Sequence, residues 1–254
     1  MFMSKFKVLR SHGKQFIPDL NAVTLPPIFR GRPSLDARTD EATRRALERL
    51  CPVGAITAEP FSLDTGRCLF CKECAMAHPD AVSFTNNYKM GSNDRRALVV
   101  TPGTDTTPFE ADAVRERICS YFGHALRLRQ VSAGGDGSTE MELNATGNVN
   151  FDFGRYGIEF TASPRHADGV VITGPITRNM AEALEICYRA IAEPKLIILA
   201  GSEAISGGLF AENRAIDRSF LATRTPDLLL PGNPVHPMTF FDGVMTLTGR
   251  KKRE

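Results

Sequence analysis

Three closely spaced cysteines constrain this chain more than any other feature of its sequence. Cys68, Cys71 and Cys74 have the spacing C-x2-C-x2-C, and Cys51 stands 17 residues upstream of the first, directly before Pro52. The triple spacing turns three thiolates toward one side of a tight loop, as a chain does around an iron–sulfur cube. The separate Cys-Pro can supply the fourth ligand. The sequence therefore predicts a small domain folded around a [4Fe–4S] cluster.

Counting ligands indicates that this domain holds one cluster. In two-cluster ferredoxins each triple run continues x3-C-P, and that fourth cysteine binds the other cluster. Here His78 stands where that fourth cysteine would be, before Pro79, so a cysteine that would bind a second cluster is absent. Cys51, before Pro52, matches such a fourth cysteine, but the three cysteines that should precede it are missing. The positions four, seven and ten residues before it are Leu47, Arg44 and Glu41. One complete ligand set remains: Cys51, Cys68, Cys71 and Cys74.

Other uses of the cysteines fit the pattern less well. Structural zinc usually takes two C-x2-C pairs. Six cysteines in 254 residues are sparse for a disulfide framework, and charges interrupt the N-terminal segment where a secretory apolar region would stand. Cys119 and Cys187 lie on apolar helical faces, and we expect both to be small buried residues. We expect His78 to lie at the surface or beside the cluster, without binding iron.

Composition excludes several classes of function. The net charge is +2 and the pI about 8.2, from interleaved acids and bases, so no broad basic field indicates nucleic-acid binding. Residues 250–253 are predicted to form a short solvated tail. No run approaches the ~18–20 apolar residues of a membrane span. We therefore expect a cytoplasmic protein that reaches the cytoplasmic face of a membrane only through partners. No hydrolase triad, P-loop or metal-hydrolase motif is present, and no catalytic residue is predicted.

The N-terminal part divides into an arm and a small domain. Residues 1–30, interrupted by prolines at 18, 26 and 27, are predicted to be an extended arm that wraps on a neighbour. Residues 31–93 are predicted to form a ferredoxin-like α+β domain. Asp40 caps a helix that runs to Leu50, and VGAIT and AVSFT are short strands. The pattern is a compressed βαβ–βαβ ferredoxin fold.

Residues 94–254 are predicted to form an α/β domain with a flavodoxin-like, doubly wound parallel sheet. Helices are expected over 111–126, from RNMAEALEICYRAIAEP and from PMTFFDGVMTL; LRLRQVSA, GVVITG, KLIILAG and DLLLPGNP are expected to contain strands. In such sheets ligands bind beyond the carboxyl ends of the strands. Three loops are expected at that edge: 134–140, 201–208 and 231–237.

Several stretches of this second domain resemble a known family. EFTASPRHADGVVITGPITRNMAEAL, ILAGSEAISGGLF and LLLPGNPVHP resemble the small subunit of group 4 [NiFe] hydrogenases, as in formate hydrogenlyase, and the related B-type, cluster-bearing subunit of respiratory complex I. The similarity covers roughly residues 126–247. The N-terminal third, with PPIFRGRPSL before the cysteines, is similar to the polyferredoxin subunit of such hydrogenases. The chain thus resembles a fusion of the two.

The resemblance also locates a departure. The family holds a proximal [4Fe–4S] cluster on four cysteines in the three loops. This chain has Asp136 and Thr139 in the first loop, Glu203 in the second and Asn233 in the third. The resemblance therefore implies that the proximal cluster is absent and that a relay to a large-subunit active site or a bound quinone is broken here. We call these four residues the vacated-cluster pocket.

Three interpretations of the vacated-cluster pocket stay open. Its oxygen atoms suit a hard cation such as Mg²⁺ or Ca²⁺, and a flavodoxin-like crevice suits a flavin. The interpretation that we favour is a pocket filled by hydrogen bonds and water. By resemblance, interface roles are expected for Arg165, His166, Arg178 and Asn179.

The sequence thus predicts an electron-transfer and docking subunit of a hydrogenase- or complex I-related oxidoreductase. Its expected partner resembles the hydrogenase large subunit or the quinone-site chain of complex I, with further electron-transfer or membrane subunits. Two alternatives remain. One is a purely structural subunit; the other is a repurposed catalytic subunit with a new cofactor or metal in the vacated-cluster pocket.

Overall fold

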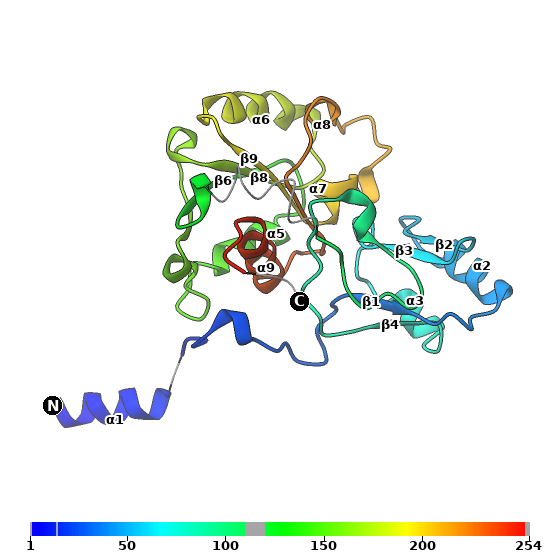
Figure 1. Cartoon of the computed structure of the whole chain (residues 1–254), viewed down its shortest axis with the longest axis horizontal. Helices are drawn as coiled ribbons and strands as arrows, with labels where there is room; N and C mark the ends of the chain where they lie inside the picture. The colour runs from blue at the N-terminus through cyan, green and yellow to red at the C-terminus, as the bar shows by residue number, and fades with distance from the viewer. Residues whose placement is uncertain (1, 14, 110–119, 252–254) are drawn as a thin grey trace.

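Two α/β units lie side by side in the computed structural model, which describes residues 2–13, 15–109 and 120–251 (Figure 1). The smaller unit has two halves of the same kind. The first contains β1 (Pro33–Leu35), α2 (Glu41–Leu50) and β2 (Ile56–Thr57); the second contains β3 (Ser62–Asp64), α3 (Glu73–Ala77) and β4 (Val82–Phe84). β1 pairs antiparallel with β4, and β2 with β3. This exchange of strands between halves is the ferredoxin-like arrangement that the sequence predicts.

Local sequence explains the first helix of this unit. Asp40 precedes α2 and accepts a hydrogen bond from the backbone N–H of Thr43 (2.9 Å), as an N-cap should. Leu47 on the inner face is fully buried. The helix ends at Leu50, and Cys51 follows as its C-cap. The end of the helix therefore fixes where the first of the four cysteines stands.

The small unit extends beyond residue 93, the boundary predicted from the sequence. β5 (Val99–Val100) pairs with β3 and so completes a three-stranded sheet. Arg32, 5% exposed, donates hydrogen bonds to the carbonyl oxygens of Thr104 and Thr106. These contacts hold residues 99–107 against the small unit. The polar segment after AVSFT therefore does not mark the end of the unit.

The larger unit is built on five parallel strands: β6 (Leu126–Ser132), β7 (Ile158–Phe160), β8 (Gly169–Thr173), β9 (Leu196–Ala200) and β10 (Leu228–Leu230). Their order is β10-β9-β8-β6-β7, with every pair parallel. This is the flavodoxin order, with the topological switch between β6 and β8. The predicted fold class is confirmed, including the expected strands in LRLRQVSA, GVVITG, KLIILAG and DLLLPGNP.

Helices cover both faces of this sheet. α6 (Arg178–Ala190), α7 (Ser202–Ser206) and α8 (Ser219–Ala222) lie over one face, and α5 (Ser138–Ala145) and α9 (Pro237–Leu247) over the other (Figure 1). Neighbouring residues of β8 belong to different layers: Val171 packs toward α9, whereas Val170 and Ile172 pack toward α6. Every residue of α9 is buried. Both faces are covered, as an all-parallel sheet requires.

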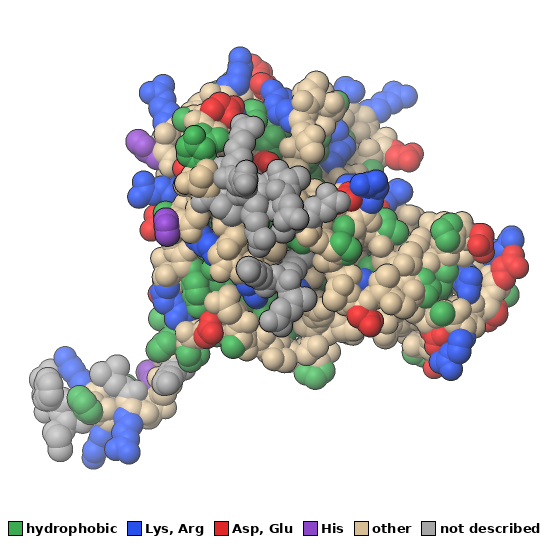
Figure 2. Space-filling model, viewed as in Figure 1, with side chains coloured by type: hydrophobic (Ala, Val, Ile, Leu, Met, Phe, Trp, Pro, Cys, Tyr) green, Lys and Arg blue, Asp and Glu red, His purple; other side chains and the backbone are tan. Residues whose placement is uncertain are grey.

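The N-terminal arm differs from the prediction. Residues 2–12, expected to be extended, form α1 (Phe2–His12), which projects from the rest of the chain (Figures 1 and 2). After it the arm lies on its own chain: Ile17 donates to the carbonyl of Asn150 (3.0 Å), and Leu20, in the 3-10 helix η1 (Leu20–Ala22), donates to the Tyr156 hydroxyl (3.0 Å). Leu20 is fully buried in the core of the larger unit. The apolar side chain of Leu20 accounts for this packing.

The C-terminal segment also differs from the prediction of a solvated tail. Arg250 donates to the carbonyl oxygens of Tyr156 and Phe122 (both 2.6 Å). The Lys251 ammonium lies 3.0 Å from the carboxylate of Asp242, a fully buried residue of α9. A charge inside the last helix therefore fixes the segment. Lys252 and Arg253 lie outside the described residues.

Two further expectations concern segments that the structure describes only in part. The helix expected over 111–126 lies mostly outside the described residues, as does Cys119; Leu126 begins β6 instead. Within the described ranges, no helix is both long and apolar enough to cross a bilayer.

Candidate iron–sulfur site and strand-end loops

The four cysteines predicted as ligands line one cavity of the small unit. Cys51 follows α2, Cys68 follows β3, and Cys71 and Cys74 bracket the start of α3. Apolar side chains form much of the remaining wall: Val53, Ile56, Leu63 and Phe84. The cysteine side chains thus line a mainly apolar space that is open to solvent on the side of Cys71.

The backbone of the cysteine loop turns inward at two residues. Phe70 (φ 54°) and Lys72 (φ 68°) adopt left-handed conformations, which are uncommon for residues other than glycine. Phe70 donates its backbone N–H to the Cys68 sulfur (3.2 Å), and Ala55 donates to the Cys51 sulfur (3.2 Å). Hydrogen bonds to cysteine sulfur are a feature by which proteins tune iron–sulfur centres. The loop geometry therefore suits thiolates.

The cysteines differ in exposure. Cys68 and Cys74 are buried, Cys51 is half-buried and Cys71 is exposed. Burial raises the pKa of Cys68 to about 12 and that of Cys74 to about 11. Both are therefore neutral thiols near pH 7 without a metal, and metal ligation must displace their protons.

The donor set fits a [4Fe–4S] cluster. The described residues contain no three His, Cys, Asp or Glu side chains arranged to hold one metal ion. In a cube, however, each thiolate binds a different iron, so four sulfurs need to surround a common space and need not converge on one point. His78 lines a different cavity, with Asp36, Arg38 and Asp40.

Three residues of the vacated-cluster pocket lie in adjoining loops. Asp136, after β6, accepts hydrogen bonds from the backbone N–H (2.8 Å) and hydroxyl (2.6 Å) of Ser138, and these lower the pKa of its carboxyl group. Glu203 lies in α7 after β9, so close to Gly135 that a side-chain carbon there would stand 2.5 Å from Glu203 Oε2. Thr139, in the first turn of α5, is buried against Gly201.

Glu203 has an unusual electrostatic environment. Burial raises the pKa of its carboxyl group, and the nearby carboxylates of Asp136 and Glu140 raise it further. Glu140 itself accepts hydrogen bonds from the hydroxyl groups of Ser132 (2.5 Å) and Thr173 (2.6 Å). The edge of the sheet between β6 and β9 thus concentrates acidic groups around Glu203.

The backbone itself occupies the switch point where a flavodoxin-like sheet binds its ligand. Gly135 and Gly174, which follow β6 and β8, pack so tightly that a side-chain carbon at Gly135 would lie 2.9 Å from the Gly174 Cα. This contact gives the flavin interpretation no support. The arrangement of the carboxylates likewise gives the hard-cation interpretation no support, since no three His, Cys, Asp or Glu side chains among the described residues are placed to hold one ion.

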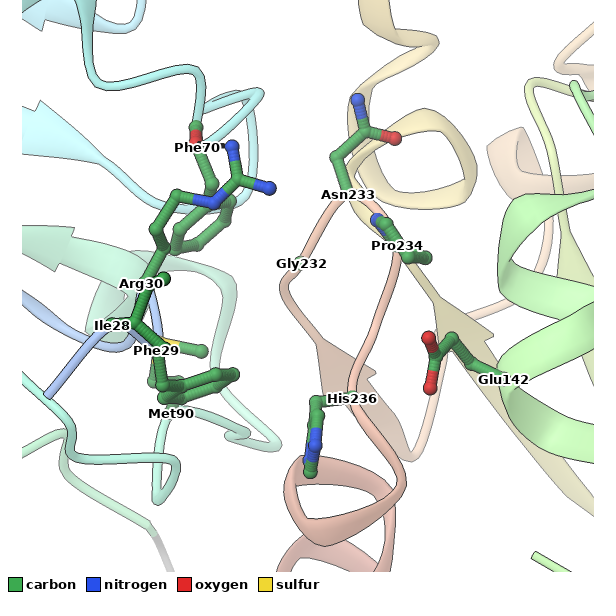
Figure 3. Close-up of a pocket in the computed structure, with 10 residues that line it drawn as sticks. All are labelled: Ile28, Phe29, Arg30, Phe70, Met90, Glu142, Gly232, Asn233, Pro234 and His236. Carbon is green, nitrogen blue, oxygen red and sulfur yellow. Dashed lines mark hydrogen bonds between the residues drawn. The ribbon is translucent and has the colours of Figure 1, made fainter. Parts of the chain in front are cut away.

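Asn233 lines a cavity of about 270 Å³ between the two units, and the other three residues do not (Figure 3). Arg30 and Glu142 lie on opposite sides of this cavity, and His236 lies at the start of α9. Burial raises the pKa of Glu142 and lowers that of His236 to about 4. His236 packs edge-on against Phe29, with 5.0 Å between ring centroids.

A direct contact joins the cysteine loop to this edge of the sheet. The Ser202 hydroxyl donates to the carbonyl of Cys68 (2.7 Å). Arg30 lies on the same side of the cavity as the cysteine loop and donates to the carbonyl of Phe70 (2.8 Å). Ser202 precedes Glu203 and is fully buried. Sequence reasoning missed Ser202, Arg30 and His236, because no spacing links residues whose contacts lie far away along the chain.

The residues expected at an interface divide between two edges. Arg178 and Asn179 are exposed and begin α6, just after the carboxyl end of β8. Arg165 and His166 form the 3-10 helix η4 (Pro164–His166) before the amino end of β8. Arg178 and Asn179 therefore lie near the strand-end loops, whereas Arg165 and His166 lie at the opposite edge of the sheet.

Comparison with known proteins finds relatives of the second unit. Residues 137–247 match the family described as NADH ubiquinone oxidoreductase, 20 Kd subunit. The B-type subunit of NADH-quinone oxidoreductase from Desulfovibrio desulfuricans is 38% identical over 107 residues, 42% of this chain and 58% of that protein. The corresponding protein of Heliobacterium modesticaldum is 39% identical over 111 residues, 43% of this chain and 63% of its own length. The chain thus spans about three-fifths of these relatives.

Two further similarities extend this set. The probable membrane-bound hydrogenase subunit mbhJ of Pyrococcus furiosus is 27% identical over 129 residues, 51% of this chain and 77% of that protein. One chain of the membrane-bound sulfane sulfur reductase, an archaeal respiratory membrane complex, is 24% identical with a TM-score of 0.45, covering 52% of this chain and 72% of that one.

Proposed function

We propose that this chain is an iron–sulfur electron-transfer and docking subunit of a complex I- or hydrogenase-related oxidoreductase. Its single [4Fe–4S] cluster would be bound by Cys51, Cys68, Cys71 and Cys74. The observation that carries the proposal is the cavity that all four cysteines line, with backbone N–H groups directed at two of the sulfurs. The family match over residues 137–247 supports the kind of assembly.

The chain's own residues have definable roles in this function. A [4Fe–4S] cluster, when bound, supplies a one-electron carrier. The apolar wall keeps water from it, and the N–H groups of Ala55 and Phe70 stabilise thiolate charge. Exposed Cys71 marks the side of the site nearest solvent, where an electron donor or acceptor can approach. Ser202 fixes the cysteine loop against the strand-end loops, so the site lies beside the proposed docking face.

A second cluster is not part of the proposal. Residues 137–247, which match the family, contain one cysteine, Cys187, and it lies on α6 among residues packed against the core. One thiolate cannot hold a cube that needs four. We therefore propose that the proximal cluster is absent and that electrons do not pass through this unit to an H₂-converting site.

The proposed partner is a large-subunit-like chain docked at the strand-end loops, with further electron-transfer or membrane subunits. Relatives that are subunits of NADH-quinone oxidoreductase and of a membrane-bound hydrogenase support this proposal. We propose that these partners hold the chain at the cytoplasmic face of a membrane.

The decisive experiment is an iron and labile-sulfide count, with EPR, on the anaerobically purified protein. About four irons per chain and a reduced-cluster signal are expected. About eight irons would contradict an empty second unit, and zinc without iron would contradict the cluster. Cys71→Ser should lose the signal and Cys187→Ser should keep it. A potential far outside the cellular range would favour the structural alternative, in which the cluster only stabilises a small domain.

A second candidate function rests on Glu203, whose raised pKa is typical of functional carboxyl groups. In this alternative the strand-end loops and the partner form a new catalytic site. Asp136→Ala would then reduce the activity of the complex by about 100-fold or more, the usual contribution of an acid–base group. Unchanged activity in that variant would contradict the alternative and leave the electron-transfer proposal intact.

A further inference from the structure

Arg30 is fixed beside the cysteine loop by its neighbours in the chain. The backbone N–H of Gly31 donates to the carbonyl of Thr85 (2.8 Å), and a side-chain carbon at Gly31 would collide with the carbonyl of Asn87. This close approach therefore fixes the backbone next to Arg30. The guanidinium Nη1 of Arg30 donates to the carbonyl oxygen of Phe70 (2.8 Å), although 40 residues separate the two in the sequence (Figure 3).

The carbonyl that Arg30 contacts belongs to the peptide group between Phe70 and Cys71. The N–H of the same group is the backbone N–H of Cys71, and the N–H of Phe70 donates to the Cys68 sulfur (3.2 Å). A cation at a carbonyl oxygen polarises the peptide group and makes its N–H a stronger donor. Arg30 thus acts on the short segment that joins two of the proposed ligands.

The charge of Arg30 is not neutralised nearby. Among the residues that the structure describes, the Phe70 carbonyl is the only hydrogen-bond partner of this guanidinium, and no carboxylate lies within ion-pair distance of it. Glu142 lies on the opposite side of the cavity between the two units (Figure 3). Lys72 and Glu73, which line the cysteine cavity, carry opposite charges that offset each other. Arg30 therefore adds an unbalanced positive charge at the cysteine loop.

A positive charge at this position favours the reduced form of a cluster. Reduction adds one electron to the assembly of iron, sulfide and thiolates, so its negative charge grows by one. A nearby cation and a stronger N–H donor both stabilise the added negative charge, and both therefore raise the reduction potential. Arg30 is exposed, so solvent and salt weaken its effect.

We propose that Arg30 is a positioning residue for electron transfer, which raises the reduction potential of the cluster bound by the four cysteines by acting through the peptide group between Phe70 and Cys71. This inference rests on the proposed function, because it requires that cluster. A packing role alone would account for the hydrogen bond to Phe70. It would not make the potential depend on the charge of residue 30, and that dependence is the expected result.

The test is an EPR-monitored redox titration of the anaerobically purified full chain, with dithionite as the source of electrons. Arg30→Gln should lower the midpoint potential, so that the ratio of reduced to oxidised cluster at a fixed potential falls on the order of tenfold, which is about 59 mV for one electron. Arg30→Lys keeps the charge and should stay closer to the wild type than Arg30→Gln does. Added salt should narrow the difference between the wild type and Arg30→Gln.

A matched control removes the same charge far from the cysteine loop. Arg127 is exposed near the start of β6, at the edge of the sheet opposite the strand-end loops, and Arg127→Gln should leave the ratio within a factor of about two. The midpoint potential does not depend on how many chains carry a cluster, so partly loaded variants can be compared directly.

Iron and labile-sulfide counts on each variant separate this inference from the proposed function. A wild-type chain without iron would contradict the proposed function itself. A loaded wild type and a loaded Arg30→Gln with the same potential would leave that function intact and overturn the role of Arg30. An equal shift in Arg127→Gln would overturn it too, because Arg30 would then act as one charge among many. So would the complete absence of a cluster from Arg30→Gln, because Arg30 would then be needed to hold the site together.

Discussion

The Ser202 hydroxyl donates a 2.7 Å hydrogen bond to the carbonyl oxygen of Cys68, across the junction between the two units. Ser202 is also bound to the third strand-end loop, because its backbone N–H donates to the carbonyl of Gly232 (2.8 Å). One buried serine thus links the cysteine loop to the loops after β9 and β10. The position of the proposed cluster is therefore coupled to the proposed docking face.

Replacing Ser202 with Ala tests this coupling. The change leaves the buried carbonyl of Cys68 without this donor, and the free energy of unfolding should fall by about 1 to 2 kcal/mol. Urea unfolding of the purified chain measures the loss. Ser83→Ala, at an exposed position of β4, should change stability by less than about 0.5 kcal/mol. Equal stability of the two variants would show that the bond does not couple the units.

Removing iron should affect the two units unequally. Cys68 and Cys74 belong to the core of the small unit, whereas the larger unit has its own two hydrophobic layers. Because metal-binding energy is folding energy in such small domains, chelation should abolish a melting transition of the small unit and preserve that of the parallel sheet. Calorimetry before and after anaerobic chelation measures both. Loss of both transitions, or of neither, would contradict this expectation.

The buried Lys251–Asp242 pair predicts a large effect of a single substitution. Lys251→Met leaves the fully buried carboxylate of Asp242 without its cation, so the free energy of unfolding should fall by about 3 to 5 kcal/mol. The double variant Asp242→Leu/Lys251→Met should recover most of that loss, since it removes both charges. Arg127→Ala breaks an exposed ion pair with Glu159 and should cost at most about 1 kcal/mol. Denaturant unfolding of the three variants measures these differences.

His236 predicts a pH dependence of stability. Burial lowers its pKa from 6.5 to about 4 in the folded chain, so below pH 6.5 the unfolded chain binds the proton more readily. Stability from this group is complete above pH 6.5 and is lost as the pH falls through 4, by about 3 kcal/mol at most. His236→Asn, which can still cap α9, should flatten this part of the curve of unfolding free energy against pH.

Sequence patterns predicted those parts of the fold that depend on local periodicity. Apolar runs indicated the strands β8, β9 and β10, and the predicted helix PMTFFDGVMTL coincides with α9. The three-residue strand β7 and the short helix α5 were missed, because so few residues show no clear period. α1 was missed because the prolines at 18, 26 and 27 indicated an extended arm, but all three follow the helix. β5 was missed because its strand character comes from pairing with β3.

The candidate site was predictable where one motif contains it. Cysteine spacing identified the four residues that line one cavity. The vacated-cluster pocket was inferred loop by loop. Asn233 lines a cavity whose lining does not include Asp136, Thr139 or Glu203, because side-chain direction within a loop is set by tertiary packing. The same limit applies to Lys251, whose burial depends on a carboxylate within α9.

Leu20, a fully buried residue of the N-terminal strap (residues 15–25), packs in one cluster with Met238, Phe240 and Phe241 of α9. During synthesis these partners leave the ribosome long after the strap does. The strap therefore stays uncovered until nearly all of these 254 residues exist, whereas the cysteine-bearing unit is complete much earlier. Loading of the proposed cluster site can thus precede closure of the larger core, and a product truncated before α9 would combine the four cysteines of that site with an exposed apolar strap.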